Sequence, residues 1–348
     1  SPGGGCMNRI ISSQTRPANF LRLSDGEEQA PERDFFRAAA RGLQNSPRSI
    51  PSRFFYDDRG SELFQEITRL PEYYPAACER EVLTRQSQAI ADYWGDNFGL
   101  IELGPGDGHK SYHLLKSLQQ RQASFRYYPV DISSGVMSPL QDNLADLDLD
   151  FHGIVGDYEA GLRYLQGREE RHVVLFLGSS IGNFSVAESL DFLRMLRMTL
   201  NEGDLLLIGF DMVKDPSVLI PAYSDRQGVT AQFNLNLLHR MNRELGADID
   251  VGQFFHHAAF NPRTHAMESY LIAHQPVEFC LKDPFSRVEV TVSMDAFDCI
   301  QTETSQKYTH SDLEFLCRGA GFRSLKTFTD AQNYFYDCLW IADAPQIP

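Results

Sequence analysis

The stretch Phe98-Gly99-Leu100-Ile101-Glu102-Leu103-Gly104-Pro105-Gly106-Asp107-Gly108 decides the predicted fold. An apolar run of strand length is followed by an acid and then by glycines at alternate positions, which predicts a buried strand, a tight turn and a helix beginning near His109. Glycine lets a ligand approach the backbone closely, and the first N–H groups of a helix are free to bind it. We therefore expect a ligand at this turn.

Strand-like and helix-like segments alternate after this stretch. The expected helices cover residues 109–119, 133–147, 158–165 and 186–199, and the expected strands cover 126–131, 151–156, 172–178 and 204–210. This alternation predicts an α/β fold with a doubly wound parallel sheet. A further helix at 311–320 and strand-like runs at 322–328 and 334–341 predict an antiparallel edge near the C-terminus.

The alternation stops between residues 214 and 300. This region holds a long helical stretch from Ala222 to Leu245 and strand-like runs at 266–273, 276–281 and 286–292. We interpret it as part of a second, α+β unit. Shorter helices over 34–43 and 61–68 precede the sheet, and a longer one over 79–94 leads into it.

Composition excludes several classes of partner. The 348 residues carry a formal charge of −15 without a basic cluster, which argues against nucleic-acid binding. The six cysteines form no CxxC pair, as in reduced cytosolic proteins, and no apolar run reaches the ~20 residues of a membrane span. We expect a cytoplasmic, monomeric protein that acts on a small molecule, without a membrane partner.

Two acids follow successive strands of the predicted sheet. Asp131 lies a little over twenty residues beyond the glycines, where an acid accepts hydrogen bonds from both hydroxyls of a ribose. Asp157-Tyr158 follows the next strand and suits an adenine, with the carboxylate accepting from the amino group and the ring stacking. Ligands of open α/β sheets bind at these carboxyl ends. The pattern therefore favours an adenosyl ligand.

The glycine spacing G-x-G-x-G, together with these acids, resembles class I S-adenosylmethionine (SAM)-dependent methyltransferases, which have a Rossmann-like fold. An NAD(P) oxidoreductase is the alternative for this part of the chain. It would need a pyrophosphate cradle and an acid/base pair for hydride transfer, and neither is found in the sequence.

Longer motifs resemble one methyltransferase family, the histidine-specific Nα-methyltransferases of ergothioneine biosynthesis, from about Pro51 to the C-terminus. The resemblance implies transfer of methyl groups from SAM to the α-amine of L-histidine, up to the trimethylated betaine hercynine. The motifs are Phe55-Tyr56-Asp57, Ile67 to Pro75, Pro129 to Ser133, Phe176 to Phe184, Asp211 to Asp215 and Thr302 to Tyr308.

The resemblance also implies how SAM is held. Gly104 lies against it, Lys110 and Tyr56 lie near its carboxylate, Asp131 binds the ribose, and Asp157 with Tyr158 binds the adenine.

For the acceptor, the resemblance assigns the ammonium and carboxylate to Tyr73, Asn183 and Tyr223, and the imidazole to Glu303 and Ser305. A carboxylate and a hydroxyl can together bind both nitrogens of an imidazole. Tyr73 and Asn183 are the expected catalytic residues, because they would orient the neutral amine.

One position departs from the family pattern. Ser269 stands where a methionine commonly packs against the substrate side chain, although a slip of one residue in the alignment would use Met267 instead. A smaller, polar wall would admit a differently decorated ring. The alternatives are therefore another amino acid, or a ring nitrogen of a thiolated histidine as in the related ovothiol-forming enzymes.

A SAM-binding regulatory subunit is the non-enzymatic alternative, and the intact acceptor signature argues against it. His239, His256 and His257 lack carboxylates at ligand spacing, so no metal is expected.

The expected domain division combines these observations. Residues 1–25 form a tag and a loose arm, 26–77 with 215–302 form a substrate-binding domain, and 78–214 with 303–348 form a SAM-binding methyltransferase domain.

Overall fold

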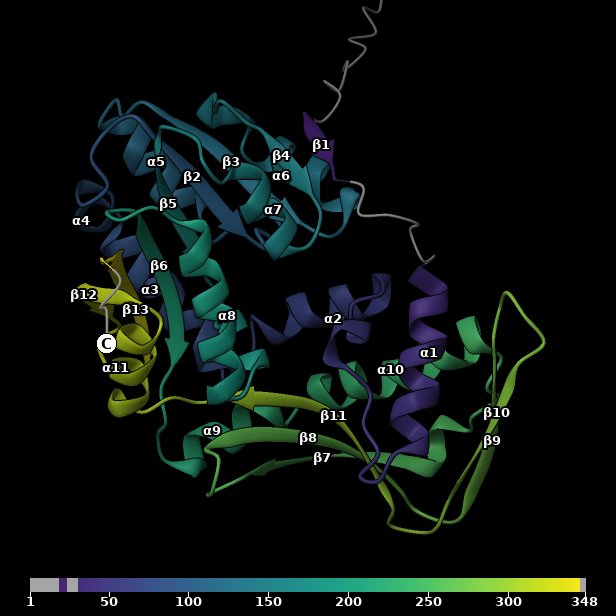
Figure 1. Cartoon of the computed structure of the whole chain (residues 1–348). Coiled ribbons are helices and arrows are strands. Elements are labelled where there is room, and N and C mark those ends of the chain that lie inside the picture. The colour runs from purple at the N-terminus through teal and green to yellow at the C-terminus, as the bar shows by residue number, and fades with distance from the viewer. Residues whose placement is uncertain (1–18, 24–30, 345–348) are drawn as a thin grey trace, which may run out of the picture.

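A computed structural model describes residues 19–23 and 31–344 of the chain. Most of the arm expected over residues 1–25 lies outside the described residues. Within that arm, Phe20–Arg22 form a short strand, β1, which pairs in parallel with Gly153–Val155. Figure 1 shows two parts, with the large sheet above and the smaller sheets below.

The large sheet has eight strands in the order β1-β4-β3-β2-β5-β6-β13-β12. Strands β1 to β6 are parallel, whereas β13 is antiparallel to both β6 and β12, so the doubly wound sheet with an antiparallel edge is confirmed. The bounds of the remaining strands are Phe98–Leu103 (β2), Phe125–Asp131 (β3), Gly153–Val155 (β4), Arg171–Phe176 (β5), Leu205–Asp211 (β6), Phe322–Thr329 (β12) and Phe335–Ala342 (β13).

Helices cover both faces of this sheet, because its central strands are apolar on both sides. Along β5, Val174 and Phe176 belong to one core cluster, and Val173 and Leu175 belong to the other. The helices are α3 (Tyr74–Arg85), α4 (Ser87–Asp92), α5 (Tyr112–Gln120) and α6 (Met137–Asn143) on the second face, and α7 (Tyr158–Leu165), α8 (Val186–Thr199) and α11 (His310–Gly319) on the first.

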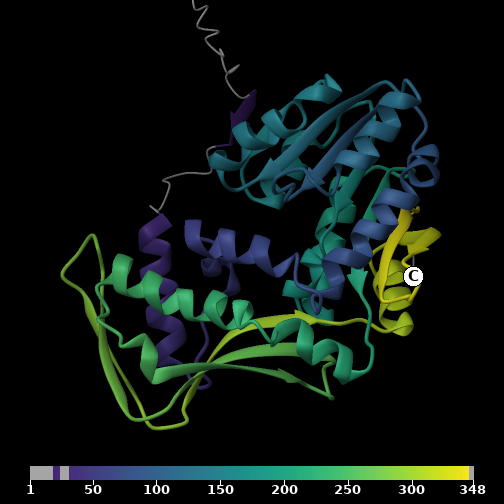
Figure 2. The same ribbon diagram turned by 180° about the vertical axis from the view of Figure 1, so that it is seen from behind.

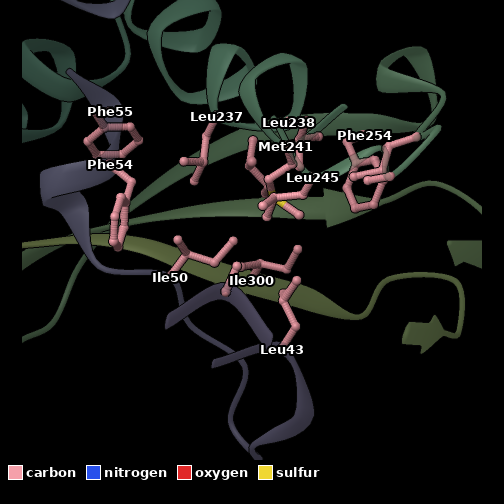
Figure 3. Packing of buried hydrophobic residues seen from close by; sticks show 14 of the residues in the cluster. Leu43, Ile50, Phe54, Phe55, Leu237, Leu238, Met241, Leu245, Phe254 and Ile300 are labelled. Atoms are coloured by element: carbon pink, nitrogen blue, oxygen red, sulfur yellow. The ribbon is translucent and has the colours of Figure 1, made fainter. Parts of the chain in front are cut away.

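The lower part contains two smaller antiparallel sheets, β11-β8-β7 and β10-β9. Its core joins α1, η1 and α10 to these strands, and Figure 3 shows Leu43, Phe55, Leu238 and Ile300 in this packing. The elements are α1 (Pro31–Gln44), η1 (Ser52–Phe55), α2 (Asp58–Ile67), α9 (Pro216–Tyr223), α10 (Val229–Leu245), β7 (Phe254–Phe260), β8 (Ala266–Ala273), β9 (Val277–Lys282), β10 (Glu289–Met294) and β11 (Cys299–Gln306).

Three long helices expected from the sequence are interrupted. The one over 79–94 breaks at Gln86, whose amide donates to the carbonyl of Thr329 at 2.9 Å. The one over 222–245 begins at Val229, because Gly228 has a φ of +73° and the Asp225 carboxylate accepts from the first N–H groups of α10.

The third interrupted helix, over 133–147, consists of η2 (Ser134–Val136), α6 and η3 (Ala145–Leu147). Pro139 supplies no N–H, so it fits only near the start of an α-helix, and α6 begins two residues before it. Strands β7 and β11 were not predicted, because the apolar residues of β7 come in adjacent pairs around two histidines and β11 is mostly polar, so neither shows a clear alternating pattern.

The chain leaves the large sheet after β6 and returns to it after β11, and the two connections lie side by side. Tyr308 N–H donates to Asp211 O at 3.0 Å, and Val213 N–H donates to Tyr308 O at 2.8 Å. Figure 2 shows this junction from behind, where β11 runs from the smaller sheet toward α11.

The expected domain division remains a proposal, and its boundary at residues 302 and 303 falls inside β11. Among residues 19–23 and 31–344, no helix has the length and apolar character that crossing a membrane requires.

Candidate active site

The turn after β2 has the backbone geometry of a close ligand contact. Gly104, Gly106 and Gly108 have φ values of +66°, +59° and +83°, which favour glycine. Gly104 N–H donates to Val130 O at 2.9 Å, and a Cβ at Gly104 would lie 2.6 Å from the Tyr158 hydroxyl. The turn therefore fits closely against the first residue of α7.

The expected adenosine-binding residues gather beside this turn. Asp131 ends β3, accepts from Ser133 N–H at 2.9 Å, and has its pKa raised by burial. Tyr158 packs edge-on against Phe176, with ring centroids 5.7 Å apart, and lies near Asp131. Asp157 has a structural role not expected from the sequence, because its carboxylate caps α7 by accepting from Ala160 N–H at 2.7 Å.

Lys110 extends from the same turn toward the end of β5. Its Nζ lies 3.7 Å from Glu79 Oε1, and a Cβ at Gly178 would be 2.3 Å from that nitrogen. The buried Glu79 also accepts from Gly178 N–H at 2.9 Å, so α3 fixes the loop that faces Lys110. The sequence reasoning did not select Glu79, since a lone acid on a helix carries no signal.

Ser179 follows in this loop and was quoted only as part of a motif. It has a φ of +55°, and its buried hydroxyl has no hydrogen-bond partner among the described residues. A strained, non-glycine residue with an unpaired buried hydroxyl is typical of a ligand-binding loop.

The two residues expected to bind the imidazole lie on one face of β11. Glu303, Ser305 and Lys307 are at alternate positions of the strand and its continuation, so their side chains share a face. Ser305 Oγ is 2.9 Å from the hydroxyl of Tyr223, at the end of α9, and the Tyr73 ring lies 6.1 Å from the Tyr223 ring. The structure thus brings Tyr73, Tyr223 and Ser305 together.

Glu303 faces Tyr56 across this pocket. Burial raises the pKa of the Glu303 carboxyl, and Lys307 opposes that rise. Tyr56 is 49% exposed, and the Glu303 charge acts on its hydroxyl. Tyr56 therefore lies near one of the expected acceptor residues.

Asn183 lies at the end of η4 (Ser180–Asn183) and is exposed. The η4 turn packs against the end of β11, where a Cβ at Gly182 would lie 3.1 Å from Gln306 O, and Tyr308 donates to Ile181 O at 2.9 Å. Asn183 is thus held between the large sheet and β11.

Ser269 and Met267 lie on the same buried face of β8. Ser269 pairs with Glu303 across the strands and Met267 pairs with Ser305. Met267 also joins the core cluster that contains Tyr223, and Tyr73 packs against that cluster. A methionine therefore does pack beside Tyr73 and Tyr223, two residues before Ser269 on the same strand.

The sequence reasoning missed a buried ionic cluster behind the pocket. Lys307 Nζ donates to the Tyr223 hydroxyl at 2.5 Å and lies 2.8 Å from Asp211 Oδ2. Asp211 also accepts from Lys214 at 2.7 Å and from the Tyr74 hydroxyl at 2.6 Å. Asp211 and Lys307 were noted only as parts of two separate motifs, because residues 96 positions apart show no joint signal in one sequence.

These residues fit SAM, whose adenosine requires an acid, an aromatic ring and a backbone without side chains. Asp131, Tyr158 and Gly104 supply these features, and the unpaired Ser179 hydroxyl faces the same edge. In the described part of the chain, no group of three or more His, Cys, Asp or Glu side chains is arranged to hold a metal ion.

Comparisons with known proteins agree with this geometry. A family model described as "Histidine-specific methyltransferase, SAM-dependent" matches residues 35–342. A protein of Mycobacterium tuberculosis named histidine N-alpha-methyltransferase is 38% identical over 303 residues, which cover 84% of this chain and 90% of that relative. A protein of the same name from Mycolicibacterium smegmatis is 37% identical, covering 91% of this chain and 96% of the relative. Ergothioneine biosynthesis protein 1 of Neurospora crassa is 30% identical, covering 84% of this chain but 33% of its own length.

Gly104→Ala should weaken binding of S-adenosylhomocysteine by an order of magnitude or more, since the added Cβ would meet the Tyr158 hydroxyl at 2.6 Å. Isothermal titration calorimetry measures this loss. The left-handed backbone costs an alanine roughly 1–2 kcal/mol as well.

Gly106→Ala is the matched control, because it has a similar φ but no protein atom within 4 Å of the added Cβ. Adding Tyr158→Phe to Gly104→Ala should restore part of the lost affinity for S-adenosylhomocysteine by removing the clashing oxygen. If both alanine variants lose equal affinity and the double variant recovers none, the Tyr158 contact is not the cause.

Glu102→Gln should stabilise the protein at pH 8 but not at pH 4. Burial raises the pKa of the Glu102 carboxyl from 4.5 to about 7, against the opposing hydrogen bond that Tyr127 donates at 2.5 Å. The folded state binds this proton more tightly than the unfolded chain, so stability falls as pH rises through this window. We expect a gain on the order of 1–3 kcal/mol at pH 8, measured by urea unfolding.

The exposed Glu314→Gln on α11 is the control and should show no such dependence. An equal gain from Glu102→Gln at both pH values would contradict the ionisation argument.

Proposed function

The chain belongs to the family of histidine-specific, SAM-dependent methyltransferases, and from this premise we propose that it methylates the α-amine of L-histidine, with hercynine as the final product. The observation that supports this proposal best is the shared face of Glu303 and Ser305 on β11, next to Tyr223. One carboxylate and one hydroxyl suit the two ring nitrogens of an imidazole.

Placement of the amine follows from the remaining residues. We place the amine at Tyr73, which precedes α3, and at Asn183, which ends η4, with SAM held by Gly104 and Lys110. When bound, SAM supplies an electrophilic methyl group. Alignment of two bound reactants can contribute roughly 7–11 kcal/mol toward the barrier in favourable cases.

The protein's part in proton transfer is limited to orientation. An α-ammonium has no lone pair, so it must lose a proton before each transfer, and an amino group that titrates above neutrality can lose that proton to water. Burial raises the pKa of Tyr73 well above its usual value, so its phenol stays protonated and acts as a hydrogen-bonding group rather than a base.

Three successive transfers remove all N–H donors from the amine. A pocket that holds the amine through few hydrogen bonds tolerates every methylation state, and Asn183 with Tyr73 provides such a pocket. We propose that one chain suffices, since all these residues come from a single copy. The five cysteines within the described residues carry free thiols, which supports a cytoplasmic location.

Mass spectrometry with labelled SAM tests the acceptor. Purified protein is incubated with histidine, thiohistidine, tryptophan and tyrosine, and the labelled position is located by fragmentation. We expect up to three methyl groups on the α-nitrogen of histidine. Label on a ring nitrogen, or on another amino acid alone, would reject the histidine α-amine, whereas binding of S-adenosylhomocysteine without any turnover would favour a regulatory subunit.

Asn183→Ala should lower kcat on the order of 10²-fold, because the amine loses its orientation. The affinity for S-adenosylhomocysteine should stay unchanged, since the proposed cofactor contacts lie at Gly104, Asp131 and Tyr158. Steady-state kinetics and calorimetry separate the two effects. A parallel loss of cofactor affinity would place Asn183 in the SAM site instead.

A further inference from the structure

The acceptor residues proposed above include no positive charge. Tyr73, Asn183, Tyr223 and Ser305 are neutral, and Glu303 is an acid. A free amino acid carries a carboxylate, which is costly to remove from water without a cation or several strong donors. A positive charge behind these side chains would strengthen their hydrogen bonds to that carboxylate.

Lys307 supplies such a charge. Its side chain is 1% exposed, and its ammonium donates to Tyr223 Oη at 2.5 Å and to Ser305 Oγ at 2.8 Å. The third N–H group faces Asp211 Oδ2 at 2.8 Å. Since all three protons are used, Lys307 can act on a ligand only through the two hydroxyl groups.

Two lysines of the cluster face one carboxylate. The positive charges of Lys307 and Lys214 outweigh burial and lower the pKa of Asp211, so that carboxylate is ionised. Lys214 lies 2.7 Å from Asp211 Oδ1, whereas Lys307 lies on the Tyr223 side of the same carboxylate. Glu303 also interacts with the Lys307 charge and would repel an anion from its own end of the pocket.

The hydrogen-bond directions also favour an anionic or proton-accepting group of the ligand next to Tyr223 and Ser305. Tyr223 and Ser305 each accept from Lys307, and their oxygens are 2.9 Å apart, so one hydroxyl proton lies between them. The other hydroxyl proton is left to point into the pocket. Each hydroxyl has a single proton to donate, so the pair presents a net donor, which a carboxylate or an unprotonated ring nitrogen can accept.

We propose that Lys307 is a positioning residue that makes the acceptor site specific for a free carboxylate, by holding its charge directly behind Tyr223, whose hydroxyl would bind that carboxylate, while Ser305 keeps its place at the imidazole. This inference rests on the proposed function, which places an amino acid in this pocket.

The test compares L-histidine with L-histidinamide, which lacks the negative charge. Calorimetry measures the dissociation constants of both ligands for the protein saturated with S-adenosylhomocysteine. Wild type should prefer histidine, and Lys307→Met should weaken histidine binding on the order of 10- to 100-fold while changing histidinamide binding little, since charge-assisted hydrogen bonds are roughly twice as strong as neutral ones. In Lys307→Met, the ratio of the histidinamide dissociation constant to the histidine dissociation constant should therefore fall toward one.

Lys214→Met is the matched control. It removes the same charge from the cluster, but Lys214 donates to Asp211, Tyr74 and a backbone carbonyl, not to Tyr223 or Ser305. This variant should keep most of the preference for histidine. An equal collapse in both variants would overturn the positioning role, because net charge alone would then account for specificity.

Other outcomes are equally decisive. If Lys307→Met weakens both ligands by the same factor, or if wild type binds them equally, the inference fails. A wild type that prefers histidine but transfers no methyl group to it overturns the proposed function and not the role of Lys307.

Lys307→Met leaves Asp211 paired with Lys214, so folding is expected and is checked by thermal unfolding. If it does not fold, Tyr223→Phe removes the hydroxyl that transmits the charge and must reduce the same ratio.

Discussion

The arrangement of the active site depends on the ion pairs of Asp211. This carboxylate is fully buried, and an isolated charge in such a position is strongly destabilising. Its partners come from three points where the chain crosses between the two parts: Tyr74 at the start of α3, Lys214 after β6, and Lys307 after β11. Because one carboxylate binds all three crossings, the end of the large sheet and the acceptor-binding strand are fixed relative to each other.

Strand β11 holds the proposed acceptor-binding residues in a fixed position relative to the large sheet. A register shift lies between Gln301 and Glu303, and the Thr302 hydroxyl within it donates to Asn234 of α10 at 2.6 Å. Because α10 holds this bulge in place, the side chains of Glu303 and Ser305, which are two residues apart, lie on the same face of β11. The η4 turn closes the other side, against Gln306. The same strand therefore belongs to the acceptor sheet at its start and contacts the cofactor edge at its end.

Local patterns in the sequence were sufficient to predict the large sheet apart from its edge strand β1, which lies in the expected loose arm. The apolar runs and the glycines after β2 depend on interactions between residues close in sequence, so they predict the strands, the turn and the edge of the sheet where a ligand binds. Helix α8 has the predicted bounds. The breaks at Gln86 and Gly228 could not be foreseen, because they depend on a tertiary hydrogen bond and on a cap. The acceptor residues were found only through resemblance to a family. Asp211 and Lys307 remained unlinked, since a pair far apart along the chain becomes visible only when folding places two connections side by side.

The lower part is assembled from segments at both ends of the chain, which has a consequence for its synthesis. Phe35 and Leu43 of α1 pack in one core with Leu238 of α10 and Ile300 of β11. At about 5–20 residues per second, a ribosome needs on the order of tens of seconds to produce the partners of these early residues. During that interval α1 can pack against η1, as in the stacked rings of Phe35 and Phe54, but not against α10 or β11. Strands β12 and β13 are synthesised later still, so the large sheet is completed only after the acceptor strand β11 has been made.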